Sequence, residues 1–290
     1  MISKNAYRCG WSPIIIIGMH RSGTTILTRA LEGLGLFVGA HLDENHEPLF
    51  FANLNNWLMR QCGAEWDYPE PFHRLTEAPD VHAWMVNRLT YFLHSPRVML
   101  YLGTSRYIRW RTPFRLDQSW GWKDPRNTYT LPLWLELFPE AKVVHIYRHG
   151  VDVAQSLKVR AERQFSAFRT KTICVDWLRV RPREATNTIR CLQLEGGFSL
   201  WEEYMSEARR QVDRLGNQAL EIQYETLLED PAEWLGKLTG FCNLPPQKQQ
   251  IETFARYLHH DKAYDYRADP DLTEFAEGVS ARLKAWGYSA

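Results

Sequence analysis

The chain has 290 residues, a formal net charge of +1 and 24% charged residues. This length suffices for one large α/β domain with a substantial core, and we expect a single domain over residues 1–290. A nearly neutral chain has no overall attraction to nucleic acid or to an acidic membrane, so any anion site must be local. The five cysteines are scattered and include no C-x-x-C pair. They favour reduced thiols over a disulfide framework or a zinc site.

The strongest local pattern lies in residues 13–35. Ile14 to Ile17 form a short apolar run, typical of a strand covered on both faces in a parallel sheet. The run stops at Gly18, so it is too short for the apolar core of a signal peptide or for a membrane span. We therefore expect a cytoplasmic protein without a transmembrane segment. From Thr24 the apolar residues follow a helical period. Strand, glycine-bounded loop and helix is the order that points backbone N–H groups at a phosphate.

The loop Gly18-Met-His-Arg-Ser-Gly-Thr-Thr25 has the phosphate-loop spacing G-x-x-x-x-G. Thr24 stands where a nucleoside triphosphatase has its lysine, and the loop cation is Arg21. A planar, permanently charged guanidinium suits an oxyanion group. The alternative is a plain strand-to-helix turn that uses glycines only for tightness.

This stretch resembles the donor-binding loop of sulfotransferases that use 3′-phosphoadenosine 5′-phosphosulfate (PAPS). In that family R-S-G-T-T surrounds the 5′-phosphosulfate. The resemblance implies donor contacts for Arg21, Ser22, Gly23, Thr24 and Thr25.

The connection after the first helix carries three carboxylates. One of them could act as general base, because an acceptor hydroxyl must lose its proton as it attacks. Glu44 is our first choice, with Asp43 or Glu47 behind it. The alternative for each is a solvated acidic turn that caps the next helix.

Residues 36–118 and 158–197 are the expected acceptor-binding or lid insertions. Within the first, residues 61–78 look like a long loop, a helix should open at Pro79, and Val98 to Leu102 suggest a short strand. The arginines after this strand form either a small basic patch or, as we favour, solvated surface. Residues 158–190 are strongly basic. They could cover the phosphates of the donor, form a surface for an anionic acceptor, or make an exposed helical face, which we favour for most of the arginines. We expect one of these arginines to touch the donor.

Lys123-Asp-Pro125 follows a strand-like segment, and Pro125 cannot continue a central ladder, so Lys123 stands at a strand tip. In sulfotransferases that resemble this chain, the K-D-P lysine holds the bridging oxygen of the donor and stabilises it as it leaves. The alternative is a surface Lys–Asp pair in a turn.

Val143 to Tyr147 predict a buried strand, and a helix starts near Val151. Arg148 at the strand end and Ser156 on the helix could converge on one anion. The pair resembles the 3′-phosphate motif of the same family, an arginine followed by a serine eight residues later. A kinase would not need this second phosphate site.

Near the C-terminus, Asp230-Pro231 is a helix start, with an N-cap followed by proline. The segment before it resembles the family's late segment, which implies that Tyr224 lies close to the adenosine. The glycine-rich C-terminal loop of cytosolic steroid and phenol sulfotransferases is not visible in the sequence, which points to the bacterial and Golgi-like branches. The histidine groupings lack the spacing of a metal site, so we expect no metal.

The sequence therefore predicts an α/β protein with a central parallel sheet flanked by helices, of the P-loop nucleotide-hydrolase type. Its expected activity is transfer of a sulfuryl group from PAPS to a hydroxyl of a carbohydrate, lipid or other small-molecule acceptor. Arg21 and Lys123 would stabilise charge on the transferred group and the leaving phosphate. Two alternatives stay open: a P-loop kinase that uses ATP and magnesium, and a donor-binding protein without catalysis.

Overall fold

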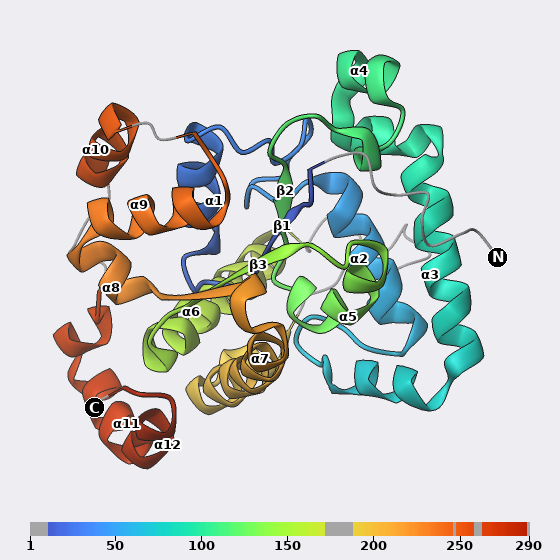
Figure 1. Cartoon of the computed structure of the whole chain (residues 1–290). Coiled ribbons are helices and arrows are strands. Elements are labelled where there is room, and N and C mark those ends of the chain that lie inside the picture. The colour runs from blue at the N-terminus through green and yellow to red at the C-terminus, as the bar shows by residue number, and fades with distance from the viewer. Residues whose placement is uncertain (1–10, 172–187, 246–247, 258–262, 289–290) are drawn as a thin grey trace.

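The computed structural model describes residues 11–171, 188–245, 248–257 and 263–288 (Figure 1). In this part of the chain one sheet has the strand order β2-β1-β3-β4, and all neighbouring pairs are parallel. The strands are β1 (Ile14–Ile17), β2 (Gly121–Lys123), β3 (Lys142–Tyr147) and β4 (Ala219–Gln223). The predicted fold class, a central parallel sheet flanked by helices, is confirmed.

The four isoleucines of β1 separate the protein into two cores. Successive side chains of a strand point to opposite faces of the sheet. Ile15 and Ile17 belong to a large core with α2 (Leu49–Gln61), α3 (Pro79–His94), α5 (Asn127–Leu137) and α7 (Leu194–Leu215). Ile14 and Ile16 belong to a smaller core with α1 (Thr24–Gly33), α8 (Tyr224–Glu229) and α9 (Pro231–Phe241). Figure 1 shows α1 and α9 on one side of the strands, and α2, α5 and α7 on the other.

Further helices complete the described part of the chain. They are η1 (Glu70–Glu77), η2 (Pro96–Val98), α4 (Met99–Trp110), η3 (Pro113–Arg115), α6 (Gly150–Lys171), η5 (Arg190–Leu192), η6 (Gly216–Gln218), α10 (Lys248–Tyr257), η8 (Asp265–Ala268), α11 (Pro270–Gly278) and α12 (Ser280–Ala285). Asp230 caps α9 by accepting the backbone N–H of Glu233, as its sequence predicts.

Two local predictions are wrong. The expected strand Val98 to Leu102 is helical, because these residues belong to η2 and α4. A short apolar run suits a buried helix as well as a strand. The expected loop over residues 61–78 contains η1. The helix at Pro79 is confirmed as α3. The basic segment is α6 as far as Lys171, and residues 172–187 lie outside the described residues, together with Cys9, Cys174, His259 and His260.

Gly23 lets the phosphate loop pack against the end of β4. Its φ is 91°, in the left-handed region that favours glycine. A Cβ atom there would lie 2.4 Å from the ring of Tyr224. The loop and the start of α8 are thus in direct contact only because residue 23 has no side chain.

We therefore expect Gly23→Ala to lower the free energy of unfolding by about 2 kcal/mol or more, from backbone strain and overpacking combined. Gly236→Ala in α9 is the matched control, since its Cβ would meet nothing within 4 Å. Alanine should stabilise that helix by about 0.5–1 kcal/mol. Denaturant unfolding measures both, and equal effects of the two substitutions would contradict the packing argument.

Candidate functional site

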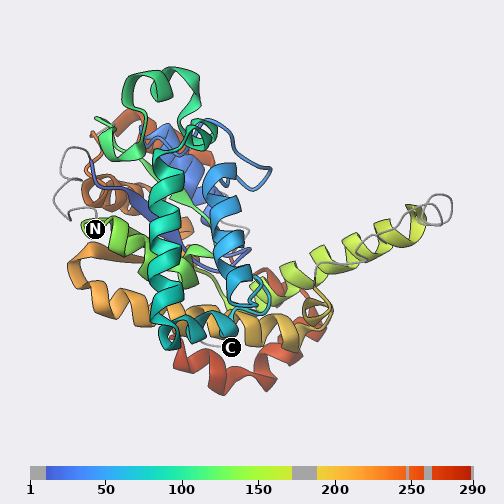
Figure 2. The same ribbon diagram turned by 90° about the vertical axis from the view of Figure 1, so that its right-hand side faces the viewer.

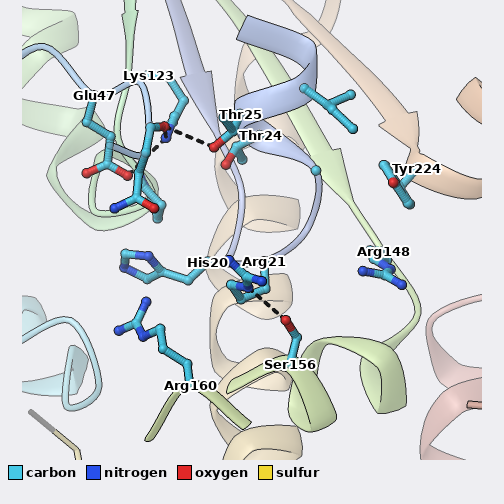
Figure 3. Close-up of a pocket in the computed structure, with 14 residues that line it drawn as sticks. His20, Arg21, Thr24, Thr25, Glu47, Lys123, Arg148, Ser156, Arg160 and Tyr224 are labelled. Carbon is cyan, nitrogen blue, oxygen red and sulfur yellow. Dashed lines mark hydrogen bonds and ion pairs between the residues drawn. The ribbon is translucent and has the colours of Figure 1, made fainter. Parts of the chain in front are cut away.

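The carboxyl ends of the four strands bring the predicted donor residues to one edge of the sheet. Lys123 ends β2, the phosphate loop follows β1, Arg148 follows β3 and Tyr224 follows β4. In open parallel sheets this edge is where ligands bind, in particular where strand order reverses. Here β1 lies between β2 and β3, and a cavity of about 210 Å³ opens in front of it (Figure 3).

Most of the predicted donor residues line this cavity. They are Arg21, Gly23, Thr24, Thr25, Lys123, Arg148, Ser156 and Tyr224. Ser22 is completely buried and does not line it. The first turn of α1 has neither a side-chain cap nor an acidic residue, so its free N–H groups can donate hydrogen bonds to an anion.

Arg21 joins the loop to α6. Its backbone has a φ of 72°, and its Nε donates to the Oγ of Ser156 at 2.7 Å. A left-handed conformation at a bulky residue costs energy and needs support from its surroundings. Partial burial, followed by repulsion from Arg160 and Arg148, lowers the pKa of the Arg21 guanidinium. The cavity therefore concentrates positive charge that a polyanion would relieve.

Arg148 occupies the opposite side of the cavity from Lys123 (Figure 3). Its guanidinium lies 5.1 Å from the centre of the Tyr224 ring and 3.2 Å from the Asp152 carboxylate. Asp152 also accepts the backbone N–H of Tyr266, which anchors α6 to η8. These contacts fix the guanidinium at the end of β3.

Lys123 is 1% exposed and has two oxygen partners from the connection after α1. Its Nζ donates to the backbone oxygen of Asn45 at 2.6 Å and to Oε1 of Glu47 at 3.0 Å. The Thr25 hydroxyl donates to the same Asn45 oxygen at 2.9 Å. The connection thus folds back over the phosphate loop and brings Glu47 to the cavity.

The three candidate bases have different surroundings. Asp43 accepts the backbone N–H groups of Asn45 and Glu47 and so closes a turn. Glu44 is exposed and does not line the cavity. Glu47 is 4% exposed and lines it. Burial, together with the charge of Asp124, raises the pKa of Glu47 to about 7 against the opposing effect of Lys123 and Arg126. The geometry therefore favours Glu47 over our first choice, Glu44.

Sequence reasoning did not single out His20 or Arg160, which both line the cavity; Arg160 is one of the arginines of residues 158–190, from which we expect one donor contact. The His20 ring meets Trp66 edge-on at 4.9 Å, and the Arg160 guanidinium lies 4.7 Å from the centre of a Trp66 ring. Burial, followed by the charge of Arg160, lowers the pKa of His20 well below its usual range, so the ring is neutral. Its buried Nε2 has no hydrogen-bond partner among the described residues. Figure 3 shows both residues away from Tyr224 and Arg148.

A buried amide holds this side of the site together. Asn55 on α2 donates to Asp124 at 2.9 Å and to Asn127 at 2.7 Å. Its oxygen accepts the Thr130 hydroxyl and the Trp134 indole N–H. Asp124 in turn pairs with Arg126, which reaches Glu47 at 3.5 Å. Residues far apart in the sequence thereby orient the candidate base.

These features define an α/β protein with a cationic cavity at the carboxyl ends of parallel strands, suited to a polyanionic ligand. The chain belongs to the sulfotransferase family, whose model matches residues 13–248. No curated protein sequence matches it.

Solved structures with a similar fold include the sulfotransferase domain from the curacin biosynthetic pathway, with 16% identity, 93% of this chain and 97% of that chain covered, and a TM-score of 0.50. A sulfotransferase from Alicyclobacillus acidocaldarius has 16% identity, 95% of each chain covered and a TM-score of 0.49. At 16% identity, the likeness to the curacin-pathway domain concerns the fold alone.

Within the described ranges, no group of three or more His, Cys, Asp and Glu side chains could hold a metal ion. The helices described here also include none that is both long and apolar enough to cross a membrane.

The Asn55 network makes a stability prediction. Asn55→Ala removes the hydrogen-bond partner of the Trp134 indole N–H and of Asp124 Oδ2, and each such buried group costs about 1–3 kcal/mol. We expect the free energy of unfolding to fall by about 3 kcal/mol or more in denaturant titration. Asn56→Ala, on the next residue of the same helix, should change it by less than about 1 kcal/mol. A small effect at Asn55 would show that the network contributes little.

Proposed function

We propose that the protein transfers the sulfuryl group of PAPS to a hydroxyl of a small-molecule or glycan acceptor. The observation that carries this proposal is one cavity with cations at two separated ends, Arg21 and Lys123 near the phosphate loop and Arg148 beyond Ser156. PAPS carries anionic groups at both ends of its adenosine. Membership of the sulfotransferase family favours sulfuryl transfer over the kinase alternative.

In this proposal the two ends of the donor bind to different elements. The 5′-phosphosulfate binds at the first turn of α1 with Arg21, Thr24 and Thr25. The 3′-phosphate binds at Arg148 and Ser156, and the adenosine packs near Tyr224. Ser156 accepts a hydrogen bond from Arg21, so one residue pair links the two anion subsites.

The reaction is an in-line displacement at sulfur. The acceptor oxygen forms the new S–O bond as the bond between sulfur and the 5′-phosphate oxygen breaks, and adenosine 3′,5′-bisphosphate leaves. Glu47 takes the proton of the hydroxyl. Lys123 donates to the bridging oxygen and stabilises its developing charge, since preorganised donors act strongly in a partly desolvated site. No metal is required in this scheme.

Lys123 and Glu47 form a hydrogen-bonded pair of 3.0 Å, which suits these two roles. The pair keeps the proton acceptor and the cation of the leaving group side by side before the substrates bind. In the in-line reaction the two groups separate, with Glu47 on the acceptor oxygen and Lys123 on the bridging oxygen. His20 and Arg160 bound the cavity on the same side, and we assign them to the acceptor. Their placement supports a polar acceptor.

Calorimetric titration tests the donor assignment. Adenosine 3′,5′-bisphosphate should bind without magnesium, and more tightly than ATP does with or without it. Arg148→Ala should weaken this binding by about tenfold to a hundredfold, the cost of a lost hydrogen bond to a charged group.

Ser156→Ala should weaken the same binding by a smaller factor, and Arg214→Ala, at an exposed site on α7, should leave it unchanged. Magnesium-dependent ATP binding that ignores Arg148 would support the kinase instead. The non-catalytic alternative would be supported by a different result. The wild type would bind the bisphosphate, but substitution of Lys123 or Glu47 would change no sulfuryl-transfer rate.

The raised pKa of Glu47 makes a prediction about pH. A general base must be ionised, so kcat/KM should rise with pH through about 7 and then level off. Glu47→Gln should lower kcat by about a hundredfold to ten-thousandfold and remove this rise. Glu44→Gln is the matched comparison on the exposed neighbour. If Glu44→Gln lowered kcat as much, and Glu47→Gln kept the rise of kcat/KM with pH, the general base would be Glu44.

A further inference from the structure

An apolar groove of about 500 Å³ lies outside the candidate active site. Helices α2, α3, α4 and the turn η2 form it, and its walls are Phe50, Leu54, Trp57, Phe92 and Leu100 together with Arg97 and Asn53. None of these residues lines the cavity at the strand ends. Its volume falls within the roughly 300–1,000 Å³ that is usual for ligand pockets. Figure 2 looks onto this side of the molecule, with α3 in front and α2 beside it.

Large apolar side chains continue from the groove onto the surface of α3. Val81, Trp84 and Tyr91 are 43%, 43% and 58% exposed. Their spacing of three and seven residues puts them on one stripe of the helix. Trp84 lies 5.6 Å from Trp57, between ring centres, and Trp57 lines the groove. The groove and the stripe therefore form one apolar surface, which we name the α3–α4 face.

The charge of this region is one-sided. From Pro79, the first residue of α3, to Leu116 the chain has six arginines and one carboxylate, that of Asp80, although the whole chain is nearly balanced. Arg88 and Arg97 are exposed, and their guanidinium groups lie over Trp84 and Phe92 at 5.7 and 5.2 Å. Neither has a carboxylate within ion-pair distance in the part of the chain that the structure describes. Two free cations thus border the apolar surface.

We propose that the α3–α4 face docks on an anionic lipid surface, with one acyl chain in the groove and the headgroups against Arg88 and Arg97. Exposed aromatic rings beside arginines are typical of proteins that lie on a membrane interface. A lipid joins an apolar chain to an anionic head, which matches a groove with cations at its rim. This interaction goes beyond the proposed sulfuryl transfer and does not depend on it.

Co-sedimentation of the full chain with vesicles tests the docking. Vesicles that contain phosphatidylglycerol should bind the protein at least about tenfold more tightly than pure phosphatidylcholine, and high salt should weaken this binding. The affinity of the double variant Arg88→Gln/Arg97→Gln for these vesicles should fall about tenfold or more, because each arginine contributes a factor of roughly five. Arg29→Gln/Arg214→Gln removes the same charge from exposed sites elsewhere and should bind like the wild type.

A second variant tests the groove itself. Asn53 is exposed at the groove, and Asn53→Trp should fill it without adding charge. A short-chain phosphatidylglycerol, kept below its micelle concentration, should bind the wild type and not this variant. Thermal midpoints and far-ultraviolet circular dichroism show that each variant is folded. Equal binding to neutral vesicles, no vesicle binding, or short-chain lipid binding retained in Asn53→Trp would each overturn the proposal.

Discussion

The buried ammonium of Lys123 is the constraint on which the site depends. A lysine that is 1% exposed needs a countercharge and hydrogen-bond acceptors, because an unpaired buried charge costs several kcal/mol. Asn45 and Glu47 supply both. They belong to the connection that follows α1, so satisfying Lys123 folds this connection over the phosphate loop. The same contact that stabilises the strand tip thereby places a carboxylate beside it.

The other cations follow different strands of the sheet, which keeps them apart. The carboxyl ends of these strands lie at one edge, so the cations line one cavity. β1 lies between β2 and β3, so Lys123 and Arg148 stand on either side of the phosphate loop. No single element could supply this arrangement, since each strand contributes one group. Burial and the nearness of Arg160 lower the pKa of both His20 and Arg21. An anion in the cavity would remove this repulsion, so part of its binding energy is prepared by the fold.

Local patterns in the sequence predict the frame of the fold, and tertiary contacts decide the site. Each of three features has its own signal in the sequence. The apolar run marks the strand Ile14 to Ile17, a proline marks the strand tip at Lys123, and the carboxylate marks the helix cap at Asp230. Val98 to Leu102 carry none that separates helix from strand, and the structure makes them helical. Ranking Glu47 above Glu44 needs the contact with Lys123, which lies 76 positions away. His20 and Asn55 are single polar residues without a spacing signal, so only the assembled fold reveals their surroundings. The basic run of residues 158–190 predicts that an arginine reaches the donor, but it does not single out Arg160.

Net charge is a poor guide to the partners of this protein, because its charges are segregated. The chain is nearly neutral as a whole, which excludes a general attraction to polyanions. Yet Arg21, Lys123 and Arg148 meet at one cavity, while Arg88 and Arg97 border an apolar groove elsewhere. The cavity offers backbone N–H groups with its cations, which favours a compact polyanion, whereas the groove offers aromatic rings and an apolar wall. Similar charges in different surroundings therefore select different ligands.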